Sequence, residues 1–296
     1  MGDPGHVRPL SRRAFGALAL GGVAAGLAGC SSSKAPARAD RGPAVERIGY
    51  GGRPDQWGEI SFPRDRPLPK ATVIVLHGGF WRRGAGGPEQ MRPMASKLVE
   101  AGYATWNVQY RTVGGEGGWP STFDDVAMAA DHLASMHSTR IDLKRLIVVG
   151  HSAGGQLAAW LAMRPKIPAG QPGANPTVRP AGVVSLAGVL DLEAAVDLGD
   201  DAVVNVVGAT PDADPERYRI TSPIEALPLG VRTICVHGTA DQVVPISQSE
   251  RFVDDAVEAG DRAELVRVEG ADHNALIDVR APAWKQVSAA VNTLAA

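Results

Sequence analysis

Short apolar runs rich in β-branched residues alternate with longer segments of helical period along most of this chain. From about Val45 onward, strand-like runs lie at 71–79, 103–110, 145–150, 181–188, 232–238 and 263–270. Helix-like segments lie between or after them, at 89–102, 121–136, 153–164, 247–260 and 281–296. This order predicts a doubly wound, mainly parallel sheet with helices on both faces, whose strands are buried on both sides.

Two segments break the alternation. Residues 165–180, PKIPAGQPGANPTVRP, are rich in Pro and Gly, and residues 197–218 mix acidic residues with short apolar runs. Long connections of this kind often cover or shape a binding site. We therefore expect both segments to act as lids or to shape a substrate pocket.

The first thirty residues have the three-part layout of an export signal. Arg8, Arg12 and Arg13 precede an apolar stretch of 15 residues, 14–28, which ends just before Cys30. That stretch is shorter than the roughly 20 residues that cross a bilayer as a helix, so a permanent transmembrane anchor is the weaker interpretation. We assign three parts to the chain: an export signal at 1–30, a flexible tether at 31–44 and a folded domain at 45–296.

Two short stretches of the signal resemble known addresses. SRRAF at 11–15 resembles the twin-arginine signal, and LAGC at 27–30 resembles the bacterial lipobox, whose Cys becomes lipidated. These resemblances imply an exported, extracytoplasmic protein that a lipid on Cys30 holds on a bacterial membrane. The alternative is an ordinary cleaved signal in which Cys30 is incidental.

Composition narrows the class of protein. Of 296 residues, 44% are hydrophobic and 21% are charged, which suits one large α/β domain with a sizeable core. The formal net charge is −2 and there is no run rich in Lys or Arg, so we expect no nucleic-acid partner. Cys235 lies in the apolar run TICVHG, and we expect it to be a small buried residue without reactivity.

The most specific chemical pattern is GHSAGG at 150–155, between a strand-like run and a helix-like segment. In that position a G-x-S-x-G sequence turns the serine sharply outward, and the turn needs minimal side chains at Gly150 and Gly154. The hydroxyl then lies at the start of the helix, where free N–H groups favour negative charge. We predict Ser152 as a nucleophile; a purely structural turn serine is the alternative.

A serine nucleophile needs a base and a carboxylate that orients the base. His273, in the loop after the last strand-like run, is the histidine that elimination leaves. The six others lie in the signal, in or near a helix-like segment, beside the nucleophile or at a strand end: His6, His132, His137, His151, His77 and His237. Asp241 follows the preceding strand-like run and can reach His273; Asp191 is the runner-up, and Asp272 is too close in sequence to face the ring.

The order Ser152, Asp241, His273 is that of the α/β-hydrolase fold. The stretches HGGFW, VVGHSAGG, HGTADQVVP and GADHNAL together resemble the esterase branch of that superfamily, which includes kynurenine formamidases and carboxylesterases. The resemblance covers the chain from about Ile60 to Trp284 and implies the α/β-hydrolase fold for the domain at 45–296. It also implies that HGGFW, at 77–81, builds an oxyanion hole.

Backbone N–H groups that already face a carbonyl oxygen stabilise the negative charge that forms there without reorganising. On this basis we assign the donors as the N–H groups of Gly79 and Ala153, with Phe80 as a third. Trp81 is expected to prop the loop. His77 is expected to order the loop by hydrogen bonding, and a role as base is the weaker interpretation.

The sequence thus predicts an exported serine carboxylesterase that acts on a small-molecule ester through an acyl-enzyme. We expect no metal and no cofactor, because HExxH, CxxC, P-loop and dinucleotide patterns are missing from the sequence. A kynurenine formamidase-like amide hydrolase and a serine exopeptidase are alternatives. A surface-anchored binding protein that keeps the fold is the alternative from outside the enzymes. Patterns along the sequence leave the oligomeric state open.

Overall fold

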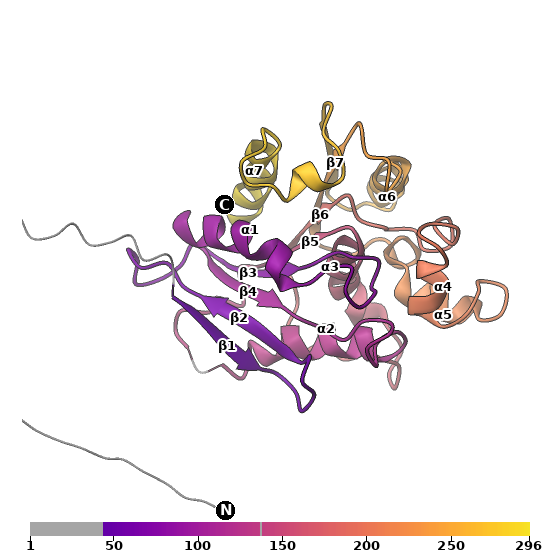
Figure 1. Ribbon diagram of the computed structural model, residues 1–296, viewed down its shortest axis with the longest axis horizontal. Helices are drawn as coiled ribbons and strands as arrows, with labels where there is room; N and C mark the ends of the chain where they lie inside the picture. Colours follow the sequence, from indigo (N-terminus) through magenta and orange to yellow (C-terminus); the bar gives the residue numbers. More distant parts are fainter. Residues whose placement is uncertain (1–43, 137) are drawn as a thin grey trace, which may run out of the picture. The chain divides into compact units, whose positions relative to one another are not determined.

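A single eight-stranded sheet organises residues 44–136 and 138–296, which the computed structural model describes (Figure 1). Its strands are β1 (Val45–Gly49), β2 (Trp57–Ser61), β3 (Thr72–Leu76), β4 (Ala104–Val108), β5 (Leu146–His151), β6 (Gly182–Leu186), β7 (Arg232–Gly238) and β8 (Ala263–Val268). They lie in the order β1-β2-β4-β3-β5-β6-β7-β8. β2 is antiparallel to both of its neighbours, and every other pair is parallel.

The central strands are buried along their whole length, as predicted. β3, β4, β5 and β6 consist mainly of Val, Ile, Leu and Ala, and none of their residues is exposed. The expectation of burial on both sides is wrong for β8, which alternates between half-buried and exposed residues. β8 is the last strand of the sheet, so it lacks a neighbour on one side.

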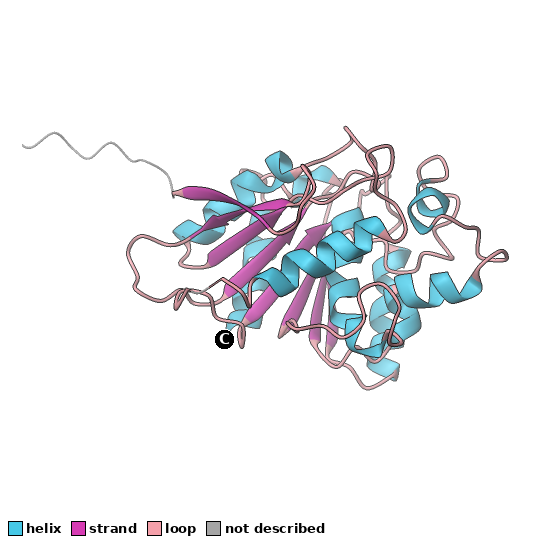
Figure 2. Cartoon of the chain, turned by 90° about the horizontal axis from the view of Figure 1, so that it is seen from below, coloured by secondary structure: helices cyan, strands magenta, loops and turns pink. Residues whose placement is uncertain are grey.

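Helices cover both faces of the sheet (Figure 2), which confirms the predicted doubly wound arrangement. One apolar core contains residues of α1 (Pro88–Glu100) and α7 (Trp284–Ala295). The other contains residues of α2 (Ser121–His132), α3 (Ala153–Met163), α4 (Ala202–Val207), α5 (Pro215–Thr221) and α6 (Ser247–Glu258). Short 3-10 turns lie at Arg164–Lys166, Pro223–Ala226 and Asn274–Leu276. In the described part of the chain, no helix has the length and apolarity needed to cross a membrane.

The two irregular segments lie at opposite edges of the sheet. Residues 197–218 follow β6, so they belong to the edge where the parallel strands end, and they contain α4 and the start of α5. Residues 165–180 join the end of α3 to the start of β6, which is the opposite edge. The expectation that 165–180 forms a lid is therefore wrong, because active sites of doubly wound sheets lie at the carboxyl ends of the strands.

The predicted export signal and Cys30 lie outside the described residues, as does the tether up to residue 43. They stay predictions.

Candidate active site

Ser152 occupies a sharp turn between β5 and α3. Its backbone has φ 55° and ψ −121°, a conformation that residues with a side chain rarely adopt. The Ser152 N–H donates a hydrogen bond to the Leu186 carbonyl at 2.8 Å, which ties the turn to β6. This strained strand–turn–helix geometry is that of a nucleophile elbow.

Two glycines make the turn sterically possible. A Cβ on Gly150 would lie 1.9 Å from the Gly154 carbonyl oxygen, and a Cβ on Gly154 would lie 2.3 Å from the Leu76 carbonyl oxygen. Both distances are far below van der Waals contact, so β3, β5 and α3 can approach each other only without side chains here. The sequence-based expectation of minimal side chains at these two positions agrees with this packing.

His273 and Asp241 form a hydrogen-bonded pair beside this turn. His273 Nδ1 lies 2.7 Å from Asp241 Oδ2, although the two residues come from loops after different strands. The other carboxylate oxygen, Oδ1, accepts the N–H groups of Val243 and Val244 at 2.8 and 3.0 Å. Burial alone would raise the pKa of Asp241, but the bonds from His237, His273 and the two backbone N–H groups outweigh it and hold the pKa well below its usual range.

A second histidine, His237, also faces Asp241. Its Nε2 lies 3.4 Å from Asp241 Oδ2 and 3.0 Å from the Val244 carbonyl oxygen, and its Nδ1 lies 2.8 Å from Ser249 Oγ. Because Nε2 faces only acceptors, it carries the proton, and Nδ1 accepts the Ser249 hydroxyl. The sequence interpretation missed this role; the available signal was a histidine at a strand end, four residues before the candidate acid.

His151 connects the turn to the candidate base. Its Nε2 lies 2.9 Å from the His273 carbonyl oxygen, so Nε2 is the donor, and the two rings are 4.5 Å apart between centroids. Burial, followed by the neighbouring His273, lowers the pKa of His151 to about 3. His151 therefore stays neutral at physiological pH. Because His151 directly precedes Ser152, its bond to the His273 carbonyl holds His273 close to the serine turn.

The HGGFW segment lies directly over the turn. A Cβ on Gly78 would lie 3.0 Å from the Ser152 Cβ, and Gly79 and Phe80 have φ of 108° and 52°. Within residues 44–136 and 138–296, the N–H groups of Gly79, Phe80 and Ala153 donate to no acceptor. Three unsatisfied donors next to a serine hydroxyl form a place where an oxyanion could bind.

Three side chains hold this segment in place. Tyr110 donates its hydroxyl hydrogen to the His77 carbonyl at 2.7 Å and stacks on the His77 ring at 4.2 Å. Burial lowers the pKa of His77 to about 4, so its ring is neutral, and its Nδ1 lies 2.8 Å from the Gly78 carbonyl oxygen. Trp81 is 1% exposed and donates from Nε1 to Gln156 Oε1 on α3 at 3.1 Å. Trp81 therefore braces the loop and does not line an open pocket.

The segment at 197–218 contacts the same loop. The Phe80 ring packs against Gly199, where an added Cβ would lie 2.4 Å from Phe80 Cε1. Arg82 donates from Nη2 to the carbonyl oxygens of Gly199 and Asp200. Phe80 is only half-buried, so its remaining surface is available beside the three free N–H groups. Of the two segments expected to shape the site, this one reaches it.

The other acidic candidates are engaged elsewhere. Asp191 Oδ2 lies 2.8 Å from Arg251 Nη1, and Asp191 Oδ1 accepts the Ala194 N–H at 3.0 Å. Asp272 Oδ1 accepts two backbone N–H groups of the turn that follows it, at 3.0 and 2.8 Å.

Burial raises the pKa of the Cys235 thiol to about 12, which makes it unreactive. The described residues contain no group of three or more His, Cys, Asp or Glu side chains arranged for a metal ion.

One family model and several known proteins match this chain. The BD-FAE family model matches residues 59–255. The chain is 29% identical over 191 residues to a probable carboxylic ester hydrolase, LipM, of Mycobacterium tuberculosis, covering 62% of this chain and 44% of that protein. It is 25% identical over 241 residues to a probable isoprenylcysteine alpha-carbonyl methylesterase of Oryza sativa, covering 76% of this chain and 56% of that protein. The chain thus spans about half the length of these relatives.

Two further likenesses bear on substrate and fold. The kynurenine formamidase avaC of Aspergillus versicolor is 25% identical over 221 residues, which cover 62% of this chain and 75% of that protein. The solved structure of a thermophilic esterase, Est2, from Thermogutta terrifontis superposes with a TM-score of 0.68 and 23% identity, covering 84% of this chain and 90% of that one. At this identity the superposition shows a shared fold.

Proposed function

The chain belongs to the BD-FAE family and has the α/β-hydrolase fold, and from this premise we propose that it is a serine hydrolase that cleaves carboxylic esters. Ser152 is the nucleophile, His273 the general base and acid, and Asp241 the carboxylate that orients His273. The observation that carries this assignment is the 2.7 Å bond between His273 Nδ1 and Asp241 Oδ2. That bond leaves Nε2 as the free nitrogen of the candidate base, and His151 ties the same residue to the serine turn.

The proposed reaction has two halves. Ser152 Oγ attacks the carbonyl carbon of the ester while His273 Nε2 takes the hydroxyl proton. The tetrahedral intermediate then collapses: the bond to the alcohol oxygen breaks, His273 returns the proton to that oxygen, and the acyl group stays on Ser152. In the second half, a water molecule attacks the acyl carbon and gives its proton to His273. The bond to Ser152 Oγ then breaks, His273 returns the proton to that oxygen, and the carboxylic acid leaves.

The negative charge of each intermediate lies on the former carbonyl oxygen. We assign its stabilisation to the N–H groups of Gly79 and Ala153, with Phe80 as a third donor. Loss of one such donor typically costs about 3 kcal/mol of transition-state stabilisation. The positive φ of Gly79 and Phe80 supports this assignment, because this unusual backbone leaves both N–H groups without an acceptor in the described part of the chain, whereas the Ser152 N–H is engaged by the Leu186 carbonyl.

Replacement of the nucleophile tests the proposal. Ser152→Ala should lower hydrolysis of p-nitrophenyl acetate and butyrate about a thousandfold or more, because removal of a triad serine leaves only binding and oxyanion stabilisation. A fluorophosphonate probe should label Ser152 in the unchanged protein and should not label the variant. Ser288→Ala on α7 is the matched control, because this half-buried hydroxyl donates to the Lys285 carbonyl one helical turn away and is not part of the candidate site. Full activity of Ser152→Ala, with an unchanged circular dichroism spectrum, would overturn the assignment.

Amide hydrolysis of the kynurenine formamidase type is the second candidate. The likeness to avaC, which covers 75% of that protein, favours it. Both reactions proceed through the same attack on a carbonyl carbon, so the site geometry accommodates either. Rates on N-formylkynurenine and on p-nitrophenyl acetate, measured side by side, separate the two reactions. A higher kcat/KM on the formamide would mean that the proposed substrate is an amide and not an ester.

For the place of action we propose an exported protein held on a bacterial membrane surface by a lipid on Cys30. The support is the resemblance of residues 11–15 and 27–30 to a twin-arginine signal and a lipobox. Mass spectrometry of the mature N-terminus tests it. A diacylated Cys30 as first residue is expected, whereas a mature protein that begins after Cys30 would exclude the lipid.

A further inference from the structure

The chain enters the folded domain at the edge of the sheet opposite to the candidate active site. Val45, the first residue of β1, pairs with Ser61, the last residue of β2. Ser61 in turn pairs with Thr105 near the start of β4. The tether therefore joins the domain at the edge where the parallel strands begin, whereas Ser152 follows the end of β5.

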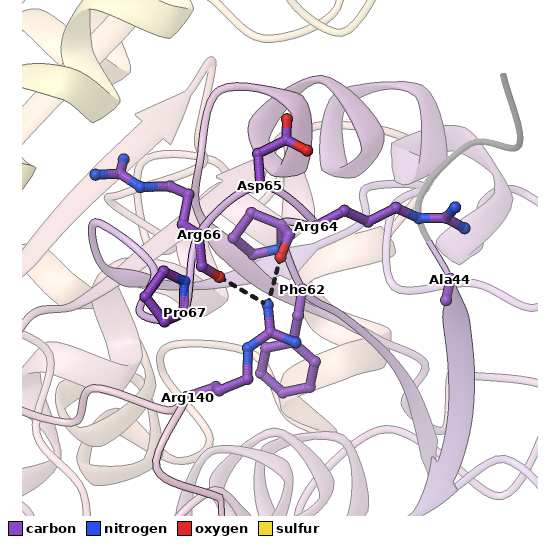
Figure 3. A pocket seen from close by; sticks show the side chains of 8 residues that line it. Ala44, Phe62, Arg64, Asp65, Arg66, Pro67 and Arg140 are labelled. Carbon is purple, nitrogen blue, oxygen red and sulfur yellow. Dashed lines mark hydrogen bonds between the residues drawn. The ribbon is translucent and has the colours of Figure 1, made fainter. Parts of the chain in front are cut away.

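Two neighbouring hollows lie at this edge. The first has a volume of about 580 Å³ and is lined by Ala44, Phe62, Pro63, Arg64, Asp65, Arg66, Pro67 and Arg140 (Figure 3). The second has a volume of about 450 Å³ and is lined by Arg66, Leu68, Pro69, Lys70, Tyr103, Arg145, Asn292, Ala295 and Ala296. Because Arg66 lines both, the hollows form one continuous surface, and Ala44, next to the tether, lies on it.

Arg140 gives the first hollow its shape. Its guanidinium lies 4.6 Å from the centre of the Phe62 ring and donates to the carbonyl oxygens of Pro63 and Arg66. In Figure 3 it lies among the lining residues, while the side chains of Arg64 and Arg66 extend away to opposite sides. The loop between β2 and β3 is thus held in one conformation, with its charged groups directed outward.

This surface is basic, although the chain as a whole has a formal net charge of −2. Five of its lining side chains are Arg or Lys and one, Asp65, is acidic. Arg145 is paired with Asp142 at 2.8 Å. Arg66 and Lys70, in contrast, form no ion pair with any residue of 44–136 or 138–296, and both are exposed.

An apolar side chain lies between these two exposed cations, of which Lys70 also has its Nζ 5.4 Å from the centre of the Tyr103 ring. In the stretch RPLPK, Leu68 is 59% exposed and has a proline on each side. Val45, where the tether meets the sheet, is 55% exposed. An exposed Leu68 with Arg66 and Lys70 on either side suits contact with a lipid headgroup layer, where the apolar group inserts and the cations meet phosphate.

We propose that this surface, the basic face formed by Arg64, Arg66, Leu68, Lys70 and Arg140, rests on an anionic lipid membrane. The exposed apolar side chain of Leu68 argues for a membrane over a soluble polyanion, and Ala44, the last residue of the predicted tether, lines the same face. The candidate active site then opens away from the lipid, toward the surrounding solution. The inference concerns how the protein is oriented and holds whether or not Cys30 is acylated and whatever Ser152 hydrolyses.

The test measures binding of the protein lacking residues 1–30 to vesicles, so that no acyl chain contributes. Both apolar cores consist of residues from 50 to 291, so this protein keeps every contact of the described fold. Vesicles of phosphatidylcholine alone are compared with vesicles containing about one-third phosphatidylglycerol. We expect binding to the anionic vesicles only, and weaker binding as salt is raised.

Three variants locate the contact. Arg66→Gln with Lys70→Gln should weaken binding about tenfold or more, since each cation near an anionic surface contributes to attraction. Leu68→Ser should weaken it less and independently of salt. Arg53→Gln with Arg83→Gln removes the same charge from a hollow at the opposite edge and should leave binding unchanged.

Several results would overturn the proposal. They are absence of vesicle binding, equal losses in the Arg53/Arg83 control, and binding to heparin without binding to vesicles. If vesicle binding appears only when residues 31–43 are also removed, the tether itself and not a membrane would be the segment that covers this face. Vesicle binding is measured without substrate, so failure here leaves the proposed hydrolase reaction untouched, and an inactive Ser152→Ala protein should bind as well as the unchanged one.

Discussion

At the scale of single residues, surroundings decide what each histidine can do. His77 and His151 are buried, and burial lowers the pKa of each, to about 4 and about 3. Neither ring takes up a proton readily near neutral pH. His273 is 7% exposed and has one nitrogen on Asp241, so among the histidines that the structure describes it alone combines access with an orienting carboxylate. Elimination along the sequence reached the same residue by position, without any knowledge of burial.

His237 should act as a positioning residue for Asp241. His237→Ala removes a neighbour of Asp241 Oδ2 and should lower kcat about tenfold, with little change in KM, because the His237 side chain is fully buried. The acid limb of the pH profile of kcat should shift as well, since His273 would meet a less firmly held carboxylate. Steady-state kinetics from about pH 5 to 9 provide the measurement.

Two further variants serve as controls for that experiment. His237→Gln retains a side-chain donor and should recover part of the lost kcat. His132→Ala removes a half-buried imidazole at the C-terminal end of α2, outside the candidate active site, and should leave kcat unchanged. Loss of stability in His237→Ala with kcat and pH profile intact would reduce its role to packing.

At the scale of elements, the serine turn depends on how closely α3 approaches β3. Gly154→Ala should destabilise the protein by about 2–3 kcal/mol, as overpacking of a tight core contact does. The added Cβ would lie 2.3 Å from the Leu76 carbonyl oxygen and 2.4 Å from that of His77, both backbone atoms. Because His77 begins the loop of candidate oxyanion donors, activity should fall together with stability.

Urea unfolding, combined with the p-nitrophenyl acetate assay, measures both effects. Gly52→Ala is the matched control, because a Cβ there meets no atom within 4 Å. It should change the free energy of unfolding by a few tenths of a kcal/mol at most. A Gly154→Ala protein as stable and active as the Gly52→Ala protein would mean that α3 can shift without cost.

The elements themselves were predictable where one physical signal dominated. The six strand-like runs and five helix-like segments match β3 to β8 and the helices α1, α2, α3, α6 and α7, with ends shifted by a few residues. The hairpin of β1 and β2 has mixed polar and apolar residues on a sheet edge, so its pattern is weak. The short helices α4 and α5 are buried by tertiary contacts, which a one-dimensional pattern does not contain.

At the scale of the whole molecule, the sequence predicted the three candidate catalytic residues but not the residues that contact them. Ser152, Asp241 and His273 come from a turn and two loops whose residue types follow from the reaction they are proposed to perform. The contacts of His151 and His237 depend on which strands are neighbours, and that order is decided by the fold. The lid expected at 165–180 failed for the same reason, because alternation along a chain does not say at which edge a connection lies.

The bond from Arg82 to segment 197–218 bears on how this protein can diverge. Arg82 contacts the carbonyl oxygens of Gly199 and Asp200, which every residue type possesses. Substitution of Asp200 would remove its solvent-exposed ion pair with Arg82 at 3.9 Å but would leave both carbonyl contacts in place. Insertion or deletion of a single residue nearby would instead move both carbonyls out of reach. Relatives should thus differ here by substitutions and not by insertions or deletions. A segment transferred from a relative in place of 197–218 should therefore have the same number of residues.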